Sequence, residues 1–407
     1  MADRTYDLVL FGATGFTGGL TAEYLARHAP AGCRWALAGR NRSKLEAVRS
    51  RLAGQAGLAG QPDLAELPLL VADVNDPESL RAVAEASRVV ISTVGPYILH
   101  GEPLVAACAT AGTDYVDLTG EPEFVDLMYA RHHDTAVRTG ARLVHCCGFD
   151  SIPHDLGVYF TVGQLPENVP ITVDGVVRAG GQPSGGTLRS VVAGLSRQRP
   201  GATAARARRA LEKAQPRLDD RRARAVSTPP RHENGLWLLP LPTIDPQIVA
   251  RSARALPRYG PDFTYHHYAG VRRLPVAVAA ALGVTALAGV VKVPPARELL
   301  LRRIPEGSGP TAERRAKGWF RVRFTATGGG QQVVTEVSGG DPGYGETSKM
   351  LAESALSLAF DQLPDTAGQV TTAVAMGEAL ISRLVAAGMG FRTVRTGLAD
   401  GTKRADR

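Results

Sequence analysis

The feature that most constrains the fold is a glycine-rich turn that directly follows an apolar segment near the start of the chain. Residues 7–10 predict a buried strand and residues 18–28 predict a helix. Between them lies the motif Gly12-Ala13-Thr14-Gly15-Phe16-Thr17-Gly18. Glycines at this spacing permit a tight turn and a close approach of the backbone to a pyrophosphate, and the N–H groups at a helix N-terminus favour the anion. The motif therefore predicts a dinucleotide-binding site.

Strand-like and helix-like segments alternate from residue 6 to residue 144, which is typical of βαβ units and a parallel sheet. We expect strands at 7–10, 35–38, 67–72, 89–92, 115–117 and 142–144, and helices at 18–28, 43–52, 77–86 and 104–111. Ser43 is the expected N-cap of the second helix. The pattern predicts that residues 1–150 form a Rossmann domain.

The pattern changes after residue 150, where we expect a second, mixed α+β domain over 151–345. Strands are expected at 171–177, 320–326 and 332–337, with a glycine turn at 328–330 joining the last two into an antiparallel hairpin. Helices at 347–363 and 376–387 form a C-terminal section, 346–396, which we expect to pack back on the first domain, and residues 397–407 form a polar tail. The expected class is therefore α/β with two domains.

The end of the second expected strand indicates which dinucleotide is bound. An NAD site usually places a carboxylate there to bind the ribose 2′-OH. Here the strand ends in Gly39-Arg40-Asn41-Arg42, without a carboxylate. Arg40 is placed to pair with a 2′-phosphate, helped by Ser43 and Lys44. The sequence therefore predicts NADP(H).

Two further strand ends belong to the same edge of the expected sheet. Asp73 follows the third strand and is expected either beside the adenine or as a helix N-cap. Thr93-Val94-Gly95-Pro96-Tyr97 follows the fourth strand, on the path toward the nicotinamide. Ligands bind outside the carboxyl ends of parallel strands, so both loops are predicted to contact the cofactor.

Several other kinds of chemistry are disfavoured by the sequence. None of the ten tyrosines is followed by lysine four residues later, so the tyrosine–lysine pair of short-chain dehydrogenases is missing. The four cysteines form no C-x-x-C pair, and we expect neither a disulfide framework nor a metal site. Cys146 and Cys147 are candidates for a thiol nucleophile or for core packing. We see no signal peptide and expect a cytoplasmic protein.

The formal net charge of +8 is concentrated in one segment. Residues 197–224 hold ten basic and three acidic side chains, which leaves only +1 for the rest of the chain. Such a segment attracts an acidic partner, or forms a solvated arginine-rich helix or mobile loop. A nucleic-acid partner is disfavoured because no recognised reading motif accompanies it.

Residues 274–291 form an 18-residue stretch without a charge, between Arg272-Arg273 and Lys292. Its content of alanine and glycine lowers its apolar character. Three interpretations stay open: a buried helix or acyl-lining surface, a peripheral membrane contact, and a membrane span.

Taken together, the motifs resemble those of the saccharopine dehydrogenase-like oxidoreductases and, more narrowly, of the bacterial trans-acting enoyl reductases. The resemblance rests on the segments LFGATGFTG (10–18), AGR (38–40), TVGPY (93–97), DYVDLTGE (114–121), CGFDSIP (147–153), SGGT (184–187) and AVAMG (373–377). It implies an NADPH-dependent reductase of an enoyl thioester, carried by an acidic acyl carrier protein or a polyketide synthase, in polyketide or complex-lipid biosynthesis. The basic segment 197–224 fits such a carrier.

Enoyl reduction requires a donor near the thioester oxygen and a proton source for the α-carbon. Tyr97 and Asp150 are the leading catalytic candidates, and Glu121 and His154 are lesser ones. Backbone N–H groups at 185–187 are a further candidate donor.

Two other functions stay open. An imine or amino-acid oxidoreductase would need arginines such as Arg178 and Arg189 around a substrate carboxylate. A membrane-associated protein that binds NADP without catalysis is the second alternative. We also expect the second domain to offer a sheet for a homodimer.

Overall fold

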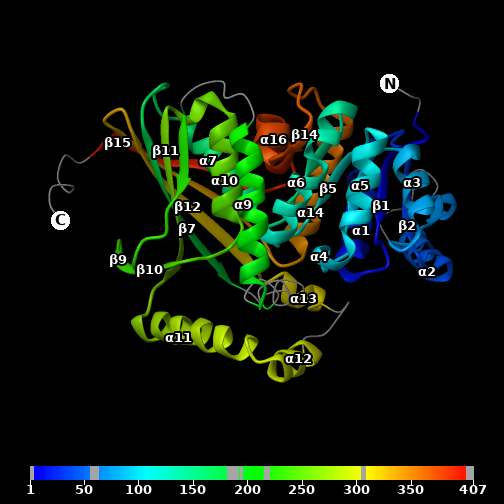
Figure 1. Ribbon diagram of the computed structural model, residues 1–407, viewed down its shortest axis with the longest axis horizontal. Helices are drawn as coiled ribbons and strands as arrows, with labels where there is room; N and C mark the ends of the chain where they lie inside the picture. Colours follow the sequence, from blue (N-terminus) through cyan, green and yellow to red (C-terminus); the bar gives the residue numbers. More distant parts are fainter. Residues whose placement is uncertain are drawn as a thin grey trace.

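The computed structural model describes residues 4–55, 64–180, 192, 196–214, 221–303 and 309–399. Two sheets lie side by side, with helices on their faces (Figure 1). The α/β class and the mixed second sheet predicted from the sequence are confirmed.

The first sheet contains seven strands, and all of its neighbouring pairs are parallel. In spatial order they are β14 (Gly368–Val370), β6 (Arg142–Val144), β5 (Asp114–Asp117), β4 (Ser87–Ser92), β1 (Tyr6–Phe11), β2 (Trp35–Gly39) and β3 (Leu69–Val71). The chain order reverses direction between β1 and β4, and ligands bind at such a switch point, outside the carboxyl ends of the strands. The six strands expected from the sequence are present.

Helices cover both faces of the first sheet. On one face lie α1 (Phe16–His28), α2 (Arg42–Ala53) and α14 (Gly345–Phe360), and on the other lie α3 (Pro77–Ala86), α5 (Glu102–Ala111) and α6 (Pro122–Thr139). Strand β1 is buried on both sides: Leu8 and Leu10 belong to one core cluster, and Val9 and Phe11 belong to the other. A strand covered on both faces needs a continuous apolar run, as residues 8–11 provide.

Two helix caps differ from the sequence predictions. Asn41, not Ser43, caps α2, because its side chain accepts a hydrogen bond from the Lys44 N–H at 2.9 Å. Asp76, not Asp73, caps α3 by accepting from the second and third N–H groups of the helix. In both cases the cap is the polar residue immediately before the first helical turn, because only that position lets a side-chain oxygen reach the free N–H groups of the turn.

The second sheet is mixed. Its order is β15 (Gly390–Leu398), β13 (Gln331–Gly339), β12 (Trp319–Gly328), β7 (Ile171–Gly180), β11 (Asp262–Val271), β10 (Leu236–Pro240) and β9 (Arg231–Glu233), with β8 (Arg222–Ala225) also paired to β11. The predicted hairpin is β12–β13, and its two turn residues, Gly329 and Gly330, have φ of 57° and 75°. Positive φ at both positions is what a tight hairpin turn requires.

Helices α7 (Ile152–Val162) and α10 (Asp245–Ala255) cover the second sheet on the side of the first sheet. Gly157 of α7 permits this close packing, since an added Cβ would lie 2.3 Å from the Phe324 ring. The first residues of α7 and α10 therefore lie at the junction between the two sheets.

The C-terminal section joins both sheets. Helix α14 packs on α1, β1, β4 and β5, as expected, and α15 (Thr372–Ala375) and α16 (Gly377–Ala386) follow. The expectation of helices alone over 346–396 needs correction, because β14 completes the first sheet and β15 pairs with β13. The polar tail predicted from residue 397 also begins too early: Leu398 pairs with Gln331, and polar side chains are tolerated on an edge strand.

The remaining helices are α4 (Tyr97–His100), α9 (Gln198–Ala214), α11 (Leu274–Val291), α12 (Pro294–Arg303) and α13 (Ala312–Arg315), with single turns at Leu64–Glu66 and Pro257–Tyr259. Part of the basic segment is helix α9, which packs on α6 and is tied to it by the buried Arg208–Asp126 ion pair. Figure 1 shows α11 and α12 below the two sheets, and α11 contacts β10 and β11 of the second sheet. Within the described ranges, the structure contains no helix that combines the length and hydropathy needed to cross a membrane.

Candidate active site at the junction of the two sheets

The glycine-rich turn has a shape that only glycine permits at two positions. Gly12 has a φ of 91°, and a Cβ there would lie 2.7 Å from Oγ1 of Thr93. A Cβ on Gly18 would lie 2.2 Å from the carbonyl oxygen of Gly12. The Thr93 hydroxyl donates to that same carbonyl at 3.1 Å. Loop β1–α1 is thus held against the loop that follows β4.

The N-terminus of α1 is open to an anion. Its cap residue, Gly15, has no side chain, and the first turn contains no acidic residue. Thr14 and Gly15 are exposed, whereas Ala13 is buried in the core. Phe16 turns toward the C-terminal section, with its ring 4.9 Å from that of Tyr344. This loop fits a dinucleotide pyrophosphate, because free N–H groups at a helix N-terminus bind anions and the first turn of α1 carries no negative charge to repel one.

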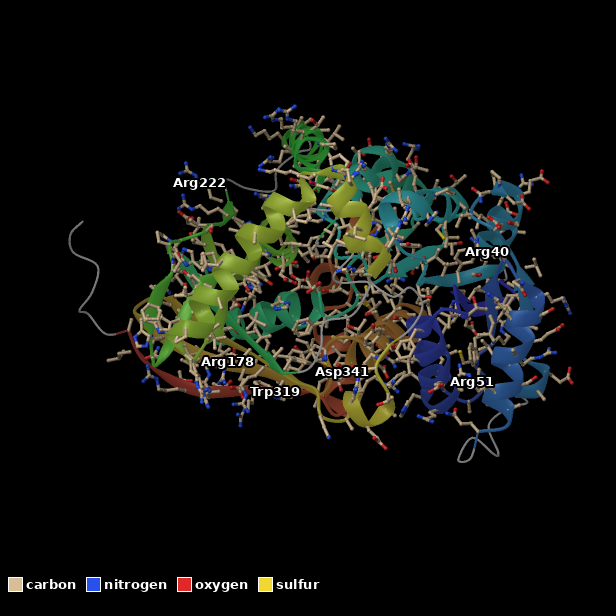
Figure 2. The ribbon with its side chains drawn as sticks, turned by 90° about the horizontal axis from the view of Figure 1, so that it is seen from below. Arg40, Arg51, Arg178, Arg222, Trp319 and Asp341 are labelled. Carbon is tan, nitrogen blue, oxygen red and sulfur yellow. The ribbon has the colours of Figure 1, made fainter. Side chains whose placement is uncertain are left out.

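Arg40 is exposed directly after β2, at the end of the molecule formed by the first sheet (Figure 2). Ser43 and Lys44 are exposed on the first turn of α2, which also lacks an acidic residue. In the described part of the chain, Arg40 forms no ion pair. Its position fits the 2′-phosphate of NADP(H), since the guanidinium can bind a phosphate through two hydrogen bonds.

Asp73 lies at the same edge but is partly engaged. Its Oδ1 accepts hydrogen bonds from the backbone and side-chain nitrogens of Asn75, at 2.8 and 3.0 Å. The Ala72 N–H donates to the Gly39 carbonyl, which brings this turn beside the end of β2. A contact with the adenosine stays a prediction.

The loop after β4 is fixed by a buried carboxylate. Glu121 accepts hydrogen bonds from the N–H groups of Tyr97 and Ile98, at 3.0 and 2.9 Å. In the same loop Gly95 is exposed, while Val94 and Pro96 are half-buried. Glu121 therefore shapes the loop, and its carboxylate is engaged by backbone donors.

The structure buries the Tyr97 hydroxyl beneath the carboxyl ends of β4 and β5, which argues against its assignment as a catalytic donor. The side chain is buried, and its hydroxyl donates to the Ser92 carbonyl at 2.9 Å. Burial raises the pKa of the phenol well above its usual value. Tyr97 is thus a core residue whose hydrogen bond satisfies the end of β4.

The two adjacent cysteines are also core residues. Cys146 and Cys147 are buried, and burial raises the pKa of both thiols well above the usual range. A thiol without access to its thiolate is a poor nucleophile. The structure thus favours core packing over thiol chemistry.

Four titratable side chains meet where α7, α10 and β11 approach the end of β6. We call Asp150, His154, Asp245 and His267 the acid–base cluster. His154 Nδ1 lies 3.0 Å from Asp245 Oδ1, and His267 Nε2 lies 3.4 Å from Asp245 Oδ2. The imidazole centroids of the two histidines are 5.0 Å apart. Asp245 therefore bridges two imidazoles.

Asp150 differs from the other three members by being half-buried. Its Oδ2 lies beside Gly120, where an added Cβ would be 3.2 Å away. This places the carboxylate at the carboxyl edge of β5 and β6. In the described part of the chain, no hydrogen bond engages it.

The four groups influence one another's protonation. Burial, reinforced by the nearby charge of Asp245, raises the pKa of Asp150 to about 7. Burial alone would lower the pKa of His154, but the Asp245 carboxylate outweighs it and raises that pKa. The two histidines likewise outweigh burial at Asp245 and hold its pKa well below the usual value. These directions favour a charged His154–Asp245 pair, beside an Asp150 whose pKa lies near neutral pH.

His267 is the neutral member, because burial lowers its pKa. Its Nδ1 lies 3.0 Å from the Tyr265 hydroxyl, which fixes the orientation of the ring. His154, Asp245 and His267 bring one ligand-type atom each within 4.8 Å of one another. We interpret these contacts as an ion pair of Asp245 with His154 and a polar contact of Asp245 with neutral His267. The expectation that the chain holds no metal stays a prediction.

The structure unites only part of the predicted site. The predicted cofactor residues lie at the carboxyl ends of β1 to β4, and Asp150 and His154 lie together near the ends of β5 and β6. Arg178 is elsewhere, in a pocket of the second sheet with Trp319. Residues 184–187 and Arg189 lie outside the described residues.

Asp245 and His267 were missed by sequence reasoning. They lie 91 and 113 residues after His154, in segments for which no helix or strand was predicted from the sequence. A paired His-His in a strand was the single available signal, and it did not indicate a partner.

Comparison with known proteins shows the family to which the chain belongs. Residues 8–144 match the family model described as the saccharopine dehydrogenase NADP binding domain. The trans-acting enoyl reductase of Mycobacterium leprae (strain TN) is 36% identical over 426 residues, covering 96% of this chain and 98% of that protein. A Mycobacterium tuberculosis (strain ATCC 25618 / H37Rv) protein assigned to the same family is 40% identical over 431 residues, with the same coverage.

Among solved structures, the apo saccharopine dehydrogenase (L-Glu forming) of Saccharomyces cerevisiae is similar over 96% of this chain and 100% of that chain. The TM-score is 0.54 at 12% sequence identity, so the likeness concerns the fold. It extends over both sheets rather than over the NADP-binding part alone.

Proposed function

Because this chain belongs to the trans-acting enoyl reductases, with a saccharopine dehydrogenase-like NADP-binding domain, we propose that Asp150 protonates the α-carbon of an enoyl thioester during its reduction. The protein is an NADPH-dependent oxidoreductase, and when bound the reduced nicotinamide supplies the hydride. The substrate we propose is an α,β-unsaturated acyl thioester.

The reaction requires one proton for each hydride. Hydride addition to the β-carbon breaks the carbon–carbon π bond and moves an electron pair onto the thioester carbonyl as an enolate. A proton delivered to the α-carbon restores the carbonyl and completes the saturated product. A group that gives up a proton near neutral pH is suited to this step, because a catalytic acid works best with a pKa near the working pH.

Asp150 has the required properties. Its pKa of about 7 keeps a large fraction protonated at neutral pH. It lies beside Gly120 at the carboxyl edge of the parallel strands, and ligands of this fold bind outside the carboxyl ends of the strands. The position of Asp150 and its raised pKa support the proposal.

The rest of the acid–base cluster acts through Asp150. The charge of Asp245 favours a proton on Asp150, and the charge of His154 opposes it. His267 contacts the other carboxylate oxygen of Asp245, with its Nε2 3.4 Å from Oδ2. We assign Asp245, His154 and His267 as positioning residues that set the proton affinity of Asp150.

A carrier protein is the proposed source of the thioester. Helix α9 exposes Arg199, Arg206 and Arg209, whereas Arg197 and Arg208 are paired with acidic residues of α6. These exposed cations support docking of an acidic acyl carrier or polyketide synthase domain. The working context we propose is polyketide or complex-lipid assembly.

Isotope labelling of a single turnover tests the reaction. We propose incubating the protein with crotonyl thioester and NADPH that carries deuterium at its reactive nicotinamide carbon. The expected product is a butyryl thioester with deuterium at the β-carbon, and the same reaction in deuterated water is expected to label the α-carbon. NADPH consumption with a 2-oxo acid and an amine, but not with the thioester, would instead identify an imine reductase. No turnover with either substrate would favour a binding protein.

Two variants separate the candidate acids. Asp150→Asn is expected to slow turnover by about 100- to 10,000-fold, the range for loss of a general acid. Tyr97→Phe is the matched control, since its hydroxyl contacts only the core. An inactive Tyr97→Phe variant that still binds NADPH would return the role of donor to Tyr97.

A further inference from the structure

The apolar helix α11 is exposed to a degree that sets it apart from the rest of the chain. Of the 17 large apolar side chains that are strongly exposed among the described residues, seven lie between residues 274 and 299. We call these seven residues the α11 surface: Leu274, Val276, Val278, Leu282, Val290, Val293 and Leu299. Contiguous exposed apolar surface of this kind marks an interaction site.

The exposed side chains occupy one side of the helix. At about 100° per residue, the five that belong to α11 cover an arc of about 200°. Ala277 and Val291 lie on the opposite side and are buried, and Val291 packs on Val192. The helix is therefore anchored along one side and presents the other to whatever covers it.

Basic residues surround this surface. Arg272, Arg273, Lys292, Arg302 and Arg303 are exposed at the ends of α11 and in α12. Glu298 is the single acidic residue from 272 to 303. An apolar surface within a positively charged rim is complementary to a membrane that contains anionic lipids.

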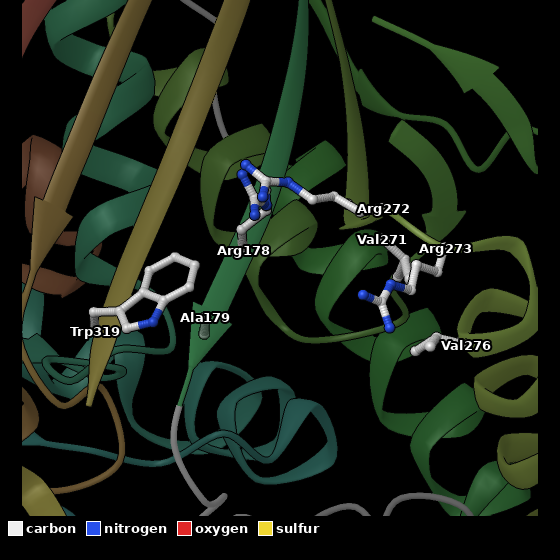
Figure 3. A pocket seen from close by; sticks show the side chains of 8 residues that line it. Arg178, Ala179, Val271, Arg272, Arg273, Val276 and Trp319 are labelled. Carbon is white, nitrogen blue, oxygen red and sulfur yellow. The ribbon is translucent and has the colours of Figure 1, made fainter. Parts of the chain in front are cut away.

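A pocket of about 350 Å³ opens beside the first turn of α11 (Figure 3). Its lining includes Val276 of α11, the ring of Trp319 and three arginines, which are Arg178, Arg272 and Arg273. Arg178 lies 5.8 Å above the Trp319 ring, and no carboxylate lines the pocket. Partial burial and the nearby arginines lower the pKa of Arg178, so an anion would relieve uncompensated positive charge.

We propose that the α11 surface docks on a membrane containing anionic phospholipids, with a phosphate headgroup in the arginine pocket. The headgroup site and the apolar helix are continuous, because Val276 belongs to both. Such a helix would lie in the interface, as peripheral proteins do. The enzyme would then work beside the lipid phase.

Two other occupants fit the surface less well. A second copy of the chain would bring Arg272 and Arg273 of one α11 against the basic ends of the other, and like charges repel. The acyl chain of a substrate needs a concave site, whereas the exposed side of α11 is a convex helix surface. The charge and the shape both favour a membrane.

Vesicle flotation of the full chain with bound NADPH tests the proposal. We expect co-flotation with phosphatidylcholine vesicles that contain about 30% phosphatidylglycerol, and weaker binding to pure phosphatidylcholine or at high salt. Val278→Asp is expected to reduce binding by about tenfold or more, because it places a charge in the apolar surface. Val385→Asp in α16 is the matched control, since both valines are 47% exposed on helices.

The arginine pocket has its own test. Arg272→Glu combined with Arg273→Glu is expected to abolish the preference for anionic vesicles. Retained melting temperature and NADPH affinity, measured on each variant, establish that the fold is intact. Turnover of a soluble crotonyl thioester is expected to be unchanged, which separates this proposal from that of enoyl reduction.

Three results would overturn the proposal. The first is flotation of Val278→Asp equal to that of the unmodified chain, and the second is equal binding to neutral and anionic vesicles. The third is a dimer in sedimentation that Val278→Asp converts to monomer without any lipid binding, which would assign α11 to self-association.

Discussion

At the scale of single residues, the site depends on polar groups whose surroundings give them different tasks. Asp150 and Glu121 are both carboxylates near strand ends. Glu121 accepts hydrogen bonds from two backbone N–H groups and shapes a loop. By contrast, burial and the charge of Asp245 raise the pKa of the Asp150 carboxyl to about 7. The two residues are both carboxylates, so their different roles come from the groups that surround each of them.

Arg40 is the residue that we expect to select NADPH over NADH. We expect Arg40→Ala to weaken NADPH binding by about 10- to 100-fold, since a hydrogen bond to a charged group contributes about 1.5–3 kcal/mol. NADH binding is expected to change little, because that cofactor lacks the 2′-phosphate. Arg42→Ala is the control: Arg42 is two residues away and is paired with Glu46. Calorimetric titration of both cofactors measures the difference, and equal losses for NADPH and NADH would contradict the assignment.

At the scale of elements, the β1–α1 turn shows which glycines are required. A Cβ on Gly18 would collide with the Gly12 carbonyl at 2.2 Å, whereas one on Gly19 would meet the movable end of Arg51 at 3.0 Å. We expect Gly18→Ala to displace α1 and to lower NADPH affinity by about tenfold or more. Gly19→Ala, in the same helix, is expected to preserve affinity, because alanine favours helix. A Gly18→Ala variant with normal NADPH affinity would contradict this expectation, because it would show that displacing α1 does not disturb the cofactor site.

Elements with strong local patterns could be predicted from the sequence. Strand β1 is a continuous apolar run, and the β12–β13 hairpin has two glycines at its turn. Strand β14 has only three residues and no apolar run, and β15 is an exposed edge strand, so neither pattern indicated a strand. Their pairing comes from distant strands, which a local pattern does not contain.

The same limit applies to the site. The cofactor residues follow strands closely in sequence, so their common position could be predicted from the parallel topology. Asp245 and His267 reach His154 from separate segments, and the Tyr97 hydroxyl turned inward because Ser92 offers a carbonyl. Such partners follow from tertiary packing.

At the scale of the whole molecule, the two sheets depend on the same C-terminal section. Helix α14 covers β1, β4 and β5, and β14 completes the first sheet. The chain is therefore interwoven, and the first 150 residues lack part of their own core.

We expect residues 1–150 expressed alone to lack a cooperative thermal transition, because the face beneath α14 would be exposed to water. A fusion of residues 1–150 to residues 345–375 through a flexible linker restores α14 and β14 and is expected to melt cooperatively. Circular dichroism and size-exclusion chromatography compare the two. A folded, NADPH-binding fragment 1–150 would contradict this dependence.

The most direct test of the central claim is the pH dependence of single-turnover NADPH oxidation with crotonyl thioester. Asp150 must carry a proton to donate it, and its pKa is about 7. We therefore expect the rate to be constant at lower pH and to fall about tenfold per pH unit above neutrality. In Asp150→Asn the rate should be low and should no longer follow this titration. If Asp150→Asn instead had the same rate as the unmodified chain and the same fall in rate above neutral pH, the assignment of Asp150 as the proton donor would be contradicted.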